Sequence, residues 1–200
     1  MSTILIVIVG AVVVLVGLTA YAAGHLTANR LGRLVLLGGL AILPLVVTGA
    51  GVAVGVQQSS QTEFCMSCHE MEPYGKSLFV DNPDSLAAVH YQKRLISRDS
   101  TCYACHTDYA MFGTAKAKLN GLRHVWVHYF KTIPEKPKLY QPYPNHNCLH
   151  CHADARPYLE SESHREVRAE LASGARSCLS CHEIAHDLDG VKAQNFWRAE

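Results

Sequence analysis

Cysteine and histidine occur together four times in this sequence, always in the order Cys-x-x-Cys-His. The four motifs span residues 65–69, 102–106, 148–152 and 178–182. They contain all eight cysteines of the chain, which are Cys65, Cys68, Cys102, Cys105, Cys148, Cys151, Cys178 and Cys181. Two such thiols form thioether bonds to one porphyrin, and the histidine that follows reaches the iron. The motifs therefore predict four covalently bound haem c groups and leave no thiol for a disulfide or a nucleophile.

Zinc is the alternative ligand for four Cys-x-x-Cys pairs, because their thiolates would suffice for two tetrahedral sites. A zinc site does not require a histidine directly after the second cysteine, yet all four pairs have one. This repetition favours haem over zinc.

Apolar residues are concentrated in the first 56 positions of the 200-residue chain, and the remainder is polar and rich in proline and histidine. Such a remainder has too few aliphatic side chains for an ordinary core, so we expect the porphyrins to supply buried apolar surface. The predicted fold is mostly α, with a small domain of helices and loops built around the haems. A formal net charge of +1 argues against binding of nucleic acid, which requires a strongly basic face.

Two uncharged apolar runs, residues 4–23 and 34–56, are each long enough to cross a hydrocarbon core about 30 Å thick. The first run is interpreted as a retained helix and not as a signal peptide, because no basic segment precedes it. The short loop between the runs carries Arg30 and Arg33, which places it in the cytoplasm by the positive-inside rule. Residues 1–57 are therefore predicted to anchor the chain in the cell inner membrane, and residues 58–200 to form the haem domain on the periplasmic side.

The haem domain shows three helical patterns. One is expected over residues 84–95, beginning at Asn82-Pro83 and carrying His90. Another is expected over 114–132, and a third opens with a capping box at Ser163 and ends near Gly174. Prolines between 134 and 144 mark an extended connector between the second and third motifs. Within the second apolar run, Pro44 predicts a kink.

The first motif continues as Cys-His-Glu-Met, with Met71 two residues after His69. Two residues this close do not reach opposite faces of one porphyrin, so Met71 either replaces His69 as the ligand or only packs against its surroundings. This Met, the four motifs, a preceding membrane helix and a lysine-bearing helix after the second motif resemble the NapC/NirT family of membrane-anchored tetrahaem quinol dehydrogenases. The resemblance covers about residues 34–190. It implies that Met71 ligates the iron of haem 1 in place of His69, and that quinol is oxidised beside this haem.

Further axial ligands follow from the same resemblance. The motif histidines His106, His152 and His182 would bind haems 2, 3 and 4. The opposite ligands implied are Lys118 for haem 2, His186 for haem 3 and His90 for haem 4. Lys116 is the rival of Lys118, and both lysines are alternatively solvated helix residues.

Other histidines have less defined roles. His124 stands where the family carries an acidic residue, and it is a proton acceptor for quinol, a sixth ligand of haem 1 or the ligand of haem 2 in place of a lysine. A histidine suits the first role because its ordinary pKa of about 6.5 lets it take a proton near neutral pH. The others are expected at the surface, at a haem propionate or otherwise away from the irons: His128, His146, His150 and His164.

The resemblance implies that the chain takes electrons from the membrane quinol pool, menaquinol or ubiquinol, and passes them to an extracytoplasmic cytochrome or reductase. His124 and Lys118 are the candidates for the quinol site. One rival is a membrane-anchored electron relay that accepts electrons from another membrane subunit and has no quinol site. A second rival is a small-molecule reductase that uses an open haem 1. Whether the chain is itself an enzyme, and whether it forms an oligomer, stays open at this level.

Overall fold

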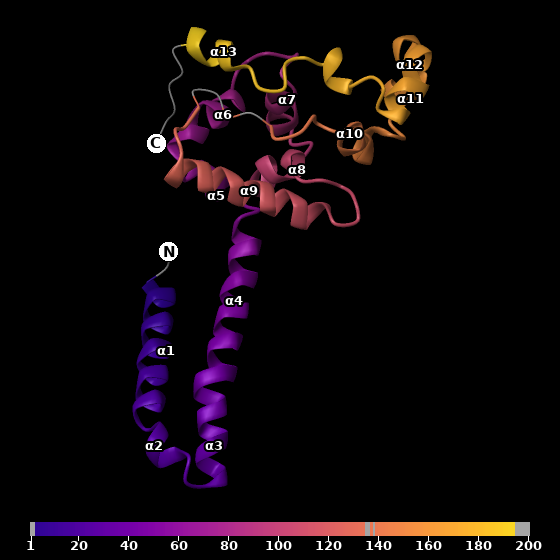
Figure 1. Ribbon diagram of the computed structural model, residues 1–200. Helices are drawn as coiled ribbons and strands as arrows, with labels where there is room; N and C mark the ends of the chain where they lie inside the picture. The colour runs from indigo at the N-terminus through magenta and orange to yellow at the C-terminus, as the bar shows by residue number, and fades with distance from the viewer. Residues whose placement is uncertain (1–2, 135–136, 138, 195–200) are drawn as a thin grey trace. The chain divides into compact units, whose positions relative to one another are not determined.

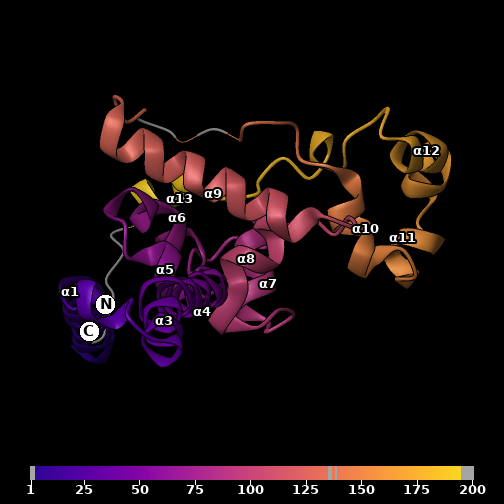
Figure 2. The ribbon, with the colours of Figure 1, turned by 60° about the horizontal axis from the view of Figure 1, so that its bottom comes forward.

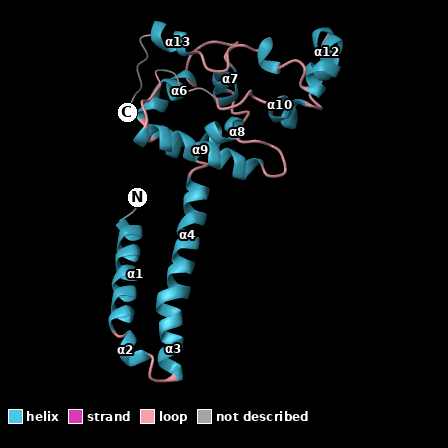
Figure 3. Cartoon of the chain, in the orientation of Figure 1, coloured by secondary structure: helices cyan, strands magenta, loops and turns pink. Residues whose placement is uncertain are grey.

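The computed structural model describes residues 3–134, 137 and 139–194, and every regular element within these ranges is a helix (Figures 1 and 3). This confirms the predicted mostly-α class. The chain divides into two units, Met1–Gln58 and Ser59–Glu200. The division falls one residue beyond the predicted end of the membrane anchor at residue 57.

The first unit contains two apolar helical stretches. The helix α1 (Thr3–Tyr21) is followed by the short α2 (Ala23–Leu26). The second stretch runs without interruption from Arg30 to Gln58 through α3 (Arg30–Leu37), the π-helix η1 (Gly38–Ile42) and α4 (Leu43–Gln58). Its 29 residues form the one described helix that is long and apolar enough to cross a membrane, whereas the apolar helix Val7–Tyr21 is shorter. A first span over residues 4–23 therefore stays a prediction.

The spanning helix starts four residues earlier than predicted because Asn29 caps it. Its side-chain Oδ1 accepts a hydrogen bond of 2.7 Å from the backbone N–H of Gly32. Pro44, which lacks a backbone N–H, directly follows the π-turn, in which Leu43 N donates to Gly38 O. Proline cannot donate the backbone hydrogen bond that a helix normally has at its position, and a π-turn directly before it lets the helix continue past this missing bond. The predicted disturbance at Pro44 thus takes the form of a π-helix.

Close contact between the two apolar stretches depends on one glycine. A Cβ atom added to Gly39 would lie 2.8 Å from Cγ2 of Thr19 in α1. This spacing leaves no room for a side chain, as is common where helices in membranes approach each other through small residues.

The second unit consists of short helices and one long one (Figure 2). In chain order they are α5 (Thr62–Met66), η2 (His69–Met71), α6 (Glu72–Ser77), α7 (Leu86–Gln92), η3 (Arg98–Ser100), α8 (Thr101–His106), α9 (Gly113–Phe130), α10 (Asn145–His152), α11 (Arg156–Glu160), α12 (Glu162–Ser173), η4 (Cys178–Ser180) and α13 (Leu188–Ala193). Its buried apolar side chains in the described part are few: Leu78, Val80, Ala88 and Leu171. This is the sparse aliphatic core that the composition predicts.

Two of the predicted helix starts were wrong. Asn82 does not cap the helix: its Oδ1 accepts from Asp84 N in a turn, its Nδ2 donates to Asp187, and α7 begins at Leu86. Its first N–H groups donate to Ile184 O and Ala185 O, so the chain after the fourth motif takes the place of a cap. The helix α12 begins at Glu162, one residue before the predicted capping box, and ends as expected at Gly174 in the left-handed conformation with φ 76°.

Candidate haem and electron-transfer sites

The cysteines of successive motifs approach one another. The Cys102 thiol donates a hydrogen bond to Cys65, which lowers the pKa of Cys65 to about 7. Burial and then the nearby Cys151 raise the pKa of Cys105. Cys148 likewise donates to Cys178. The four motifs therefore follow one another in space in the order of the chain.

Side chains next to the motifs tie each pair of neighbours together. Between motifs 1 and 2, the Thr62 hydroxyl donates to Arg98 O at 2.8 Å and accepts from Thr101 N at 2.9 Å. Between motifs 2 and 3, the amide of Asn147 donates to Thr107 O at 2.8 Å and accepts from Tyr109 N at 3.1 Å.

Motifs 3 and 4 are joined by Asn145, the first residue of α10. Its Nδ2 donates to Leu171 O at 2.8 Å and Arg176 O at 2.6 Å, and its Oδ1 accepts from Cys178 N at 2.9 Å. The helix α10 is thus positioned by hydrogen bonds from Asn145 to backbone groups that would otherwise lack partners.

Three motif histidines each face a second imidazole. The rings of His106 and His186 are nearly parallel, with centroids 6.2 Å apart and an interplanar angle of 17°. The rings of His152 and His90 are 5.9 Å apart at 84°. Those of His182 and His164 are 6.2 Å apart at 34°. An imidazole nitrogen binds a metal at about 2.0–2.1 Å, so two imidazoles on opposite sides of one ion have centroids about 6 Å apart. All three spacings fit two histidines on one iron.

The second histidine of each pair has its other ring nitrogen occupied. Nδ1 of His90 lies 2.7 Å from Leu86 O, and Nδ1 of His164 lies 3.1 Å from Pro157 O. A carbonyl only accepts, so both Nδ1 atoms carry the proton and both Nε2 atoms keep a lone pair. His186 Nδ1 is 2.9 Å from the buried Ser77 hydroxyl. Such outer hydrogen bonds fix the tautomer of metal-binding histidines.

Burial favours the neutral form of these rings, which is the form that binds a metal. It lowers the pKa of His186 to about 4, with His106 adding to the effect. Burial also lowers the pKa of His106, although its ring keeps an accessible face, and nearby His124 contributes. The pKa of His152 is lowered by burial and then by His90 and His182.

Motif 1 differs from the other three. The His69 side chain is 83% exposed, and no histidine ring faces it among the residues that the structure describes. Met71 is half-buried in the same turn, η2. Between them, the carboxylate of Glu70 accepts a hydrogen bond of 2.7 Å from His128 Nδ1 on α9. The side of α9 that carries His128 is thereby fixed against the first motif.

The zinc alternative finds no support in the arrangement of donors. Within the described ranges, no group of three or more His, Cys, Asp or Glu side chains is placed to hold a metal ion. Four-thiolate sites would require such a group.

The family described as "NapC/NirT cytochrome c family, N-terminal region" matches residues 27–145. The chain belongs to the NapC/NirT cytochrome c family. No solved structure shows a significant match.

Several curated relatives match most of this NapC/NirT chain. The cytochrome c-type protein NapC of Haemophilus influenzae is 23% identical over 172 residues, covering 74% of this chain and 80% of that protein. The NapC protein of Escherichia coli K12 is 26% identical over 181 residues, covering 81% and 84%. The cytochrome c-type protein TorC of the same strain is 28% identical over 180 residues, which cover 76% of this chain but only 44% of TorC. With the apolar helix Arg30–Gln58, these matches make the chain a membrane-anchored cytochrome c of electron transport.

The ring pairs differ from the ligand pairs that the resemblance to the NapC/NirT family implied. His186 faces His106 of motif 2 and not His152, because Ser77 holds it there. His90 faces His152 of motif 3 and not His182. His164, expected to be surplus, faces His182. His164 lies on the helix α12, which ends just before motif 4.

Lys118, the implied ligand of haem 2 in this NapC/NirT chain, lies beside motif 2 and is hydrogen-bonded to two hydroxyls. Lys118 Nζ donates to the hydroxyls of Ser59 at 2.9 Å and Ser60 at 2.7 Å, and it lies 4.1 Å from the centroid of the Tyr103 ring. Its rival Lys116 pairs with Asp108 at 3.0 Å. The position facing His106 is taken by His186.

The remaining histidines of the family member have protein partners. His124 Nδ1 lies 3.2 Å from the Tyr140 hydroxyl, and burial followed by Arg123 lowers its pKa. His146 Nε2 lies 2.7 Å from Asp108, and the His150 ring stacks on Tyr109 at 3.9 Å. The structure therefore brings His124 and Lys118 to different sides of α9, where His124 meets the connector and Lys118 meets residues 59 and 60.

Proposed function

We propose that each of the four motifs holds one haem c through its two cysteines. The iron ligands would be His106 with His186, His152 with His90, and His182 with His164. Met71 would ligate the iron of haem 1, as the family resemblance implies. The three ring spacings near 6 Å support this assignment for haems 2–4.

The chain is proposed to oxidise quinol beside motif 1 and to pass the electrons to a periplasmic cytochrome or reductase. One observation carries this proposal: motif 1 alone lacks a second imidazole in the described structure, whereas the other three motifs have one. Two strong ligands at haems 2–4 suit electron transfer, and an open site at motif 1 suits a substrate. Because motif 1 begins seven residues after Gln58, it stays close to the membrane in which quinol dissolves.

Oxidation of one quinol to the quinone releases two electrons and two protons. Covalent haem supplies one-electron redox chemistry, and a row of four accepts both electrons. His124, which lies on a different side of α9 from Lys118, would accept a proton after it has left the quinol, since burial and Arg123 keep its imidazole neutral near pH 7. Lys118, which donates to two hydroxyls beside Tyr103, would bind a quinol oxygen.

The test is reduction of the purified full-length protein by a menaquinol analogue, in detergent and without oxygen. Quinol oxidation predicts that the haem absorption changes to the reduced form with no other subunit present. An inert protein that dithionite still reduces would instead identify an electron relay, fed by another membrane subunit.

Replacing Met71 tests the first iron ligand. Met71→His is expected to change the absorption spectrum and lower the potential of one haem, because imidazole stabilises ferric iron more than a thioether does. Redox titration with optical detection measures the shift. Met111→His is the matched control, since Met111 is 90% exposed, and it should leave the spectrum unchanged. Identical spectra for both variants would assign Met71 to packing.

Acid is expected to slow quinol oxidation through His124. The pKa of this residue lies below its ordinary value of 6.5, so the imidazole is neutral above that lowered pKa and protonated below it. Only the neutral form accepts a proton, and the rate should therefore fall on the acid side. In His124→Gln the overall rate is lower and this acid limb disappears. His146→Gln is the control and should keep the acid limb of the rate profile. If the acid limb persisted in His124→Gln and disappeared in His146→Gln, His146 and not His124 would be the proton acceptor.

A further inference from the structure

The last turn of α6 contains a buried serine hydroxyl with two partners. Ser77 Oγ donates a hydrogen bond of 2.6 Å to Tyr74 O and lies 2.9 Å from Nδ1 of His186. Tyr74 O is one of the carbonyls that lack a backbone partner at the end of a helix. Protein groups alone bury Ser77 completely, at 0% exposure, and a haem beside it only adds to this burial.

The direction of both hydrogen bonds at Ser77 follows from the single proton of its hydroxyl. Two oxygen atoms 2.6 Å apart repel each other unless a proton lies between them, so this proton points at Tyr74 O. A lone pair of Ser77 Oγ therefore faces His186, and Nδ1 of His186 donates the bond of 2.9 Å. Nε2 of the same ring is then free of a proton, which is the form that binds iron.

The backbone around His186 is fixed as well. Ile184 O and Ala185 O accept hydrogen bonds from the first N–H groups of α7, at 2.9 and 3.0 Å. The carboxylate of Asp187 accepts one of 2.7 Å from Asn82 Nδ2. These contacts hold the segment in place and leave the rotation of the imidazole to contacts of its own ring.

Ser77 and Tyr74 fix that rotation. The Tyr74 ring meets the His186 ring edge-on, with centroids 5.3 Å apart and an interplanar angle of 87°. Held in this way, the His186 ring is within 17° of parallel to the ring of His106. The ring pair at motif 3 instead crosses at 84°, so the near-parallel arrangement is specific to motif 2.

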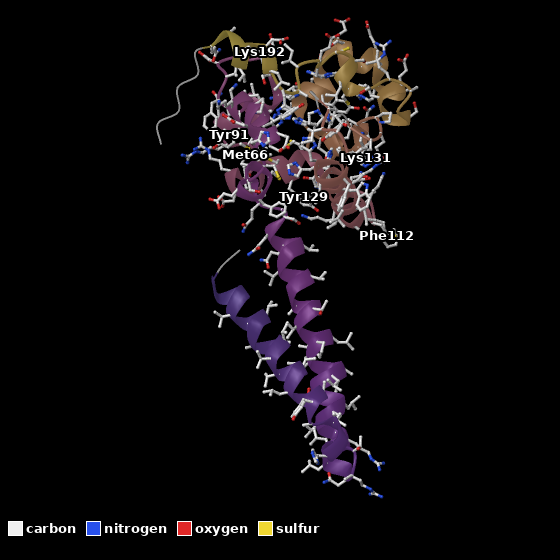
Figure 4. All side chains as sticks on the ribbon, turned by 60° about the vertical axis from the view of Figure 1, so that its left-hand side comes forward. Met66, Tyr91, Phe112, Tyr129, Lys131 and Lys192 are labelled. Atoms are coloured by element: carbon white, nitrogen blue, oxygen red, sulfur yellow. The ribbon has the colours of Figure 1, made fainter. Side chains whose placement is uncertain are left out.

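The helix α6 that carries Ser77 is itself fixed against motif 1. It begins directly after Met71, its N-cap residue. The side chain of Met66, which belongs to motif 1 and is labelled in Figure 4, lies against Gly75 and leaves no room there for a Cβ atom. One short helix thus joins the proposed ligand of haem 1 to the hydroxyl that holds the ligand of haem 2.

We propose that Ser77 is a positioning residue for haem 2, whose hydroxyl sets the orientation of His186 on the iron and the redox potential of this haem. The inference rests on the ligation of haem 2 by His106 and His186 proposed above. An acceptor at Nδ1–H makes an imidazole a more basic ligand, and a more basic ligand stabilises ferric iron over ferrous iron. The Ser77 hydroxyl therefore lowers the potential of haem 2.

Three variants of the full-length haem protein test this proposal. Ser77→Ala removes the acceptor, and Ser77→Thr keeps a hydroxyl at the same position. Ser85→Ala is the matched control, because Ser85 is also 0% exposed but its hydroxyl makes no hydrogen bond. Redox titrations followed by absorption and by electron paramagnetic resonance (EPR) measure the haem potentials. In ferric haems with two imidazoles, near-parallel rings give a rhombic EPR signal, and crossed rings give a strongly anisotropic one.

Ser77→Ala is expected to raise the potential of one haem. At the native midpoint of that haem, the ratio of ferrous to ferric iron should increase roughly two- to tenfold, which corresponds to the contribution of one hydrogen bond. A rhombic EPR signal should change shape at the same time, because the His186 ring is no longer held. Ser77→Thr and Ser85→Ala should keep the native potentials and spectrum.

Unchanged potentials and an unchanged EPR spectrum in Ser77→Ala would overturn the proposal. Equal shifts in Ser77→Ala and Ser77→Thr would also overturn it, because packing and not the hydroxyl would then be the cause. The native protein provides a test without any variant, since a spectrum with no rhombic signal would contradict near-parallel rings at haem 2. A pyridine haemochrome assay shows that each variant carries its haems.

His186→Ala separates the role of Ser77 from the ligation itself. This variant should bind carbon monoxide at one haem more than the native protein. If it does so while Ser77→Ala is silent, the ligation stands and only the role of Ser77 is overturned. If His186→Ala binds no additional carbon monoxide, the proposed ligation fails and the role of Ser77 fails with it.

Discussion

The variant His164→Ala is expected to bind carbon monoxide at one haem more than the native protein. The His164 ring is 6.2 Å from that of His182, and its Nδ1 proton is held by Pro157 O, which directs Nε2 toward the partner ring. Without this imidazole the iron at motif 4 keeps only one strong ligand and becomes open to carbon monoxide. Difference spectra with the gas, counted per chain, measure the gain.

Two further variants make the result specific. His150→Ala removes a histidine that stacks on Tyr109, and it should add no binding of carbon monoxide. The double variant His90→Ala with His164→Ala should open two haems, because His90 faces His152. If His90 were instead the partner of His182, His164→Ala would be silent and the double variant would open only one haem.

Sequence predicted the elements well where a local pattern specifies them. The long helix α9 was expected at 114–132 and runs from Gly113 to Phe130, because its apolar spacing persists over five turns. The second apolar run was expected at 34–56 and lies inside the helix Arg30–Gln58. The predicted starts of helices are less accurate, because groups distant in the sequence can accept hydrogen bonds from the first N–H groups of a helix. The start of α7 depends on Ile184 O and Ala185 O, almost a hundred residues away.

The attachment motifs could be read from sequence, but the pairing of histidines could not. Which ring faces which depends on how α7, α12 and the segment after motif 4 fold onto the motifs. Ser77 positions His186, and nothing in the spacing around either residue predicts that contact.

Asn145→Ala is expected to destabilise the haem unit by about 2–3 kcal/mol, because three backbone groups lose their partner at once. The side chain of Asn145 satisfies Leu171 O, Arg176 O and Cys178 N, and so connects the helix of motif 3 to the start of motif 4. Few buried apolar side chains are present to compensate, and Leu171 itself is one of them. The midpoint of thermal unfolding should fall by about 5–10 °C for a unit of this size. Circular dichroism of the haem bands follows the transition.

Two other asparagine variants separate this mechanism from a general effect of losing an amide. Asn145→Asp keeps the acceptor for Cys178 N but points a carboxylate oxygen at the two carbonyls, so it should destabilise at least as strongly as Asn145→Ala. Asn120→Ala removes an amide from α9 that makes no side-chain hydrogen bond within the described structure, and alanine favours the helix. An Asn145→Ala protein as stable as Asn120→Ala would mean that the thioether-bound haems alone hold motifs 3 and 4 together. A loss confined to the two Asn145 variants would show that polar contacts to the backbone replace the missing aliphatic core.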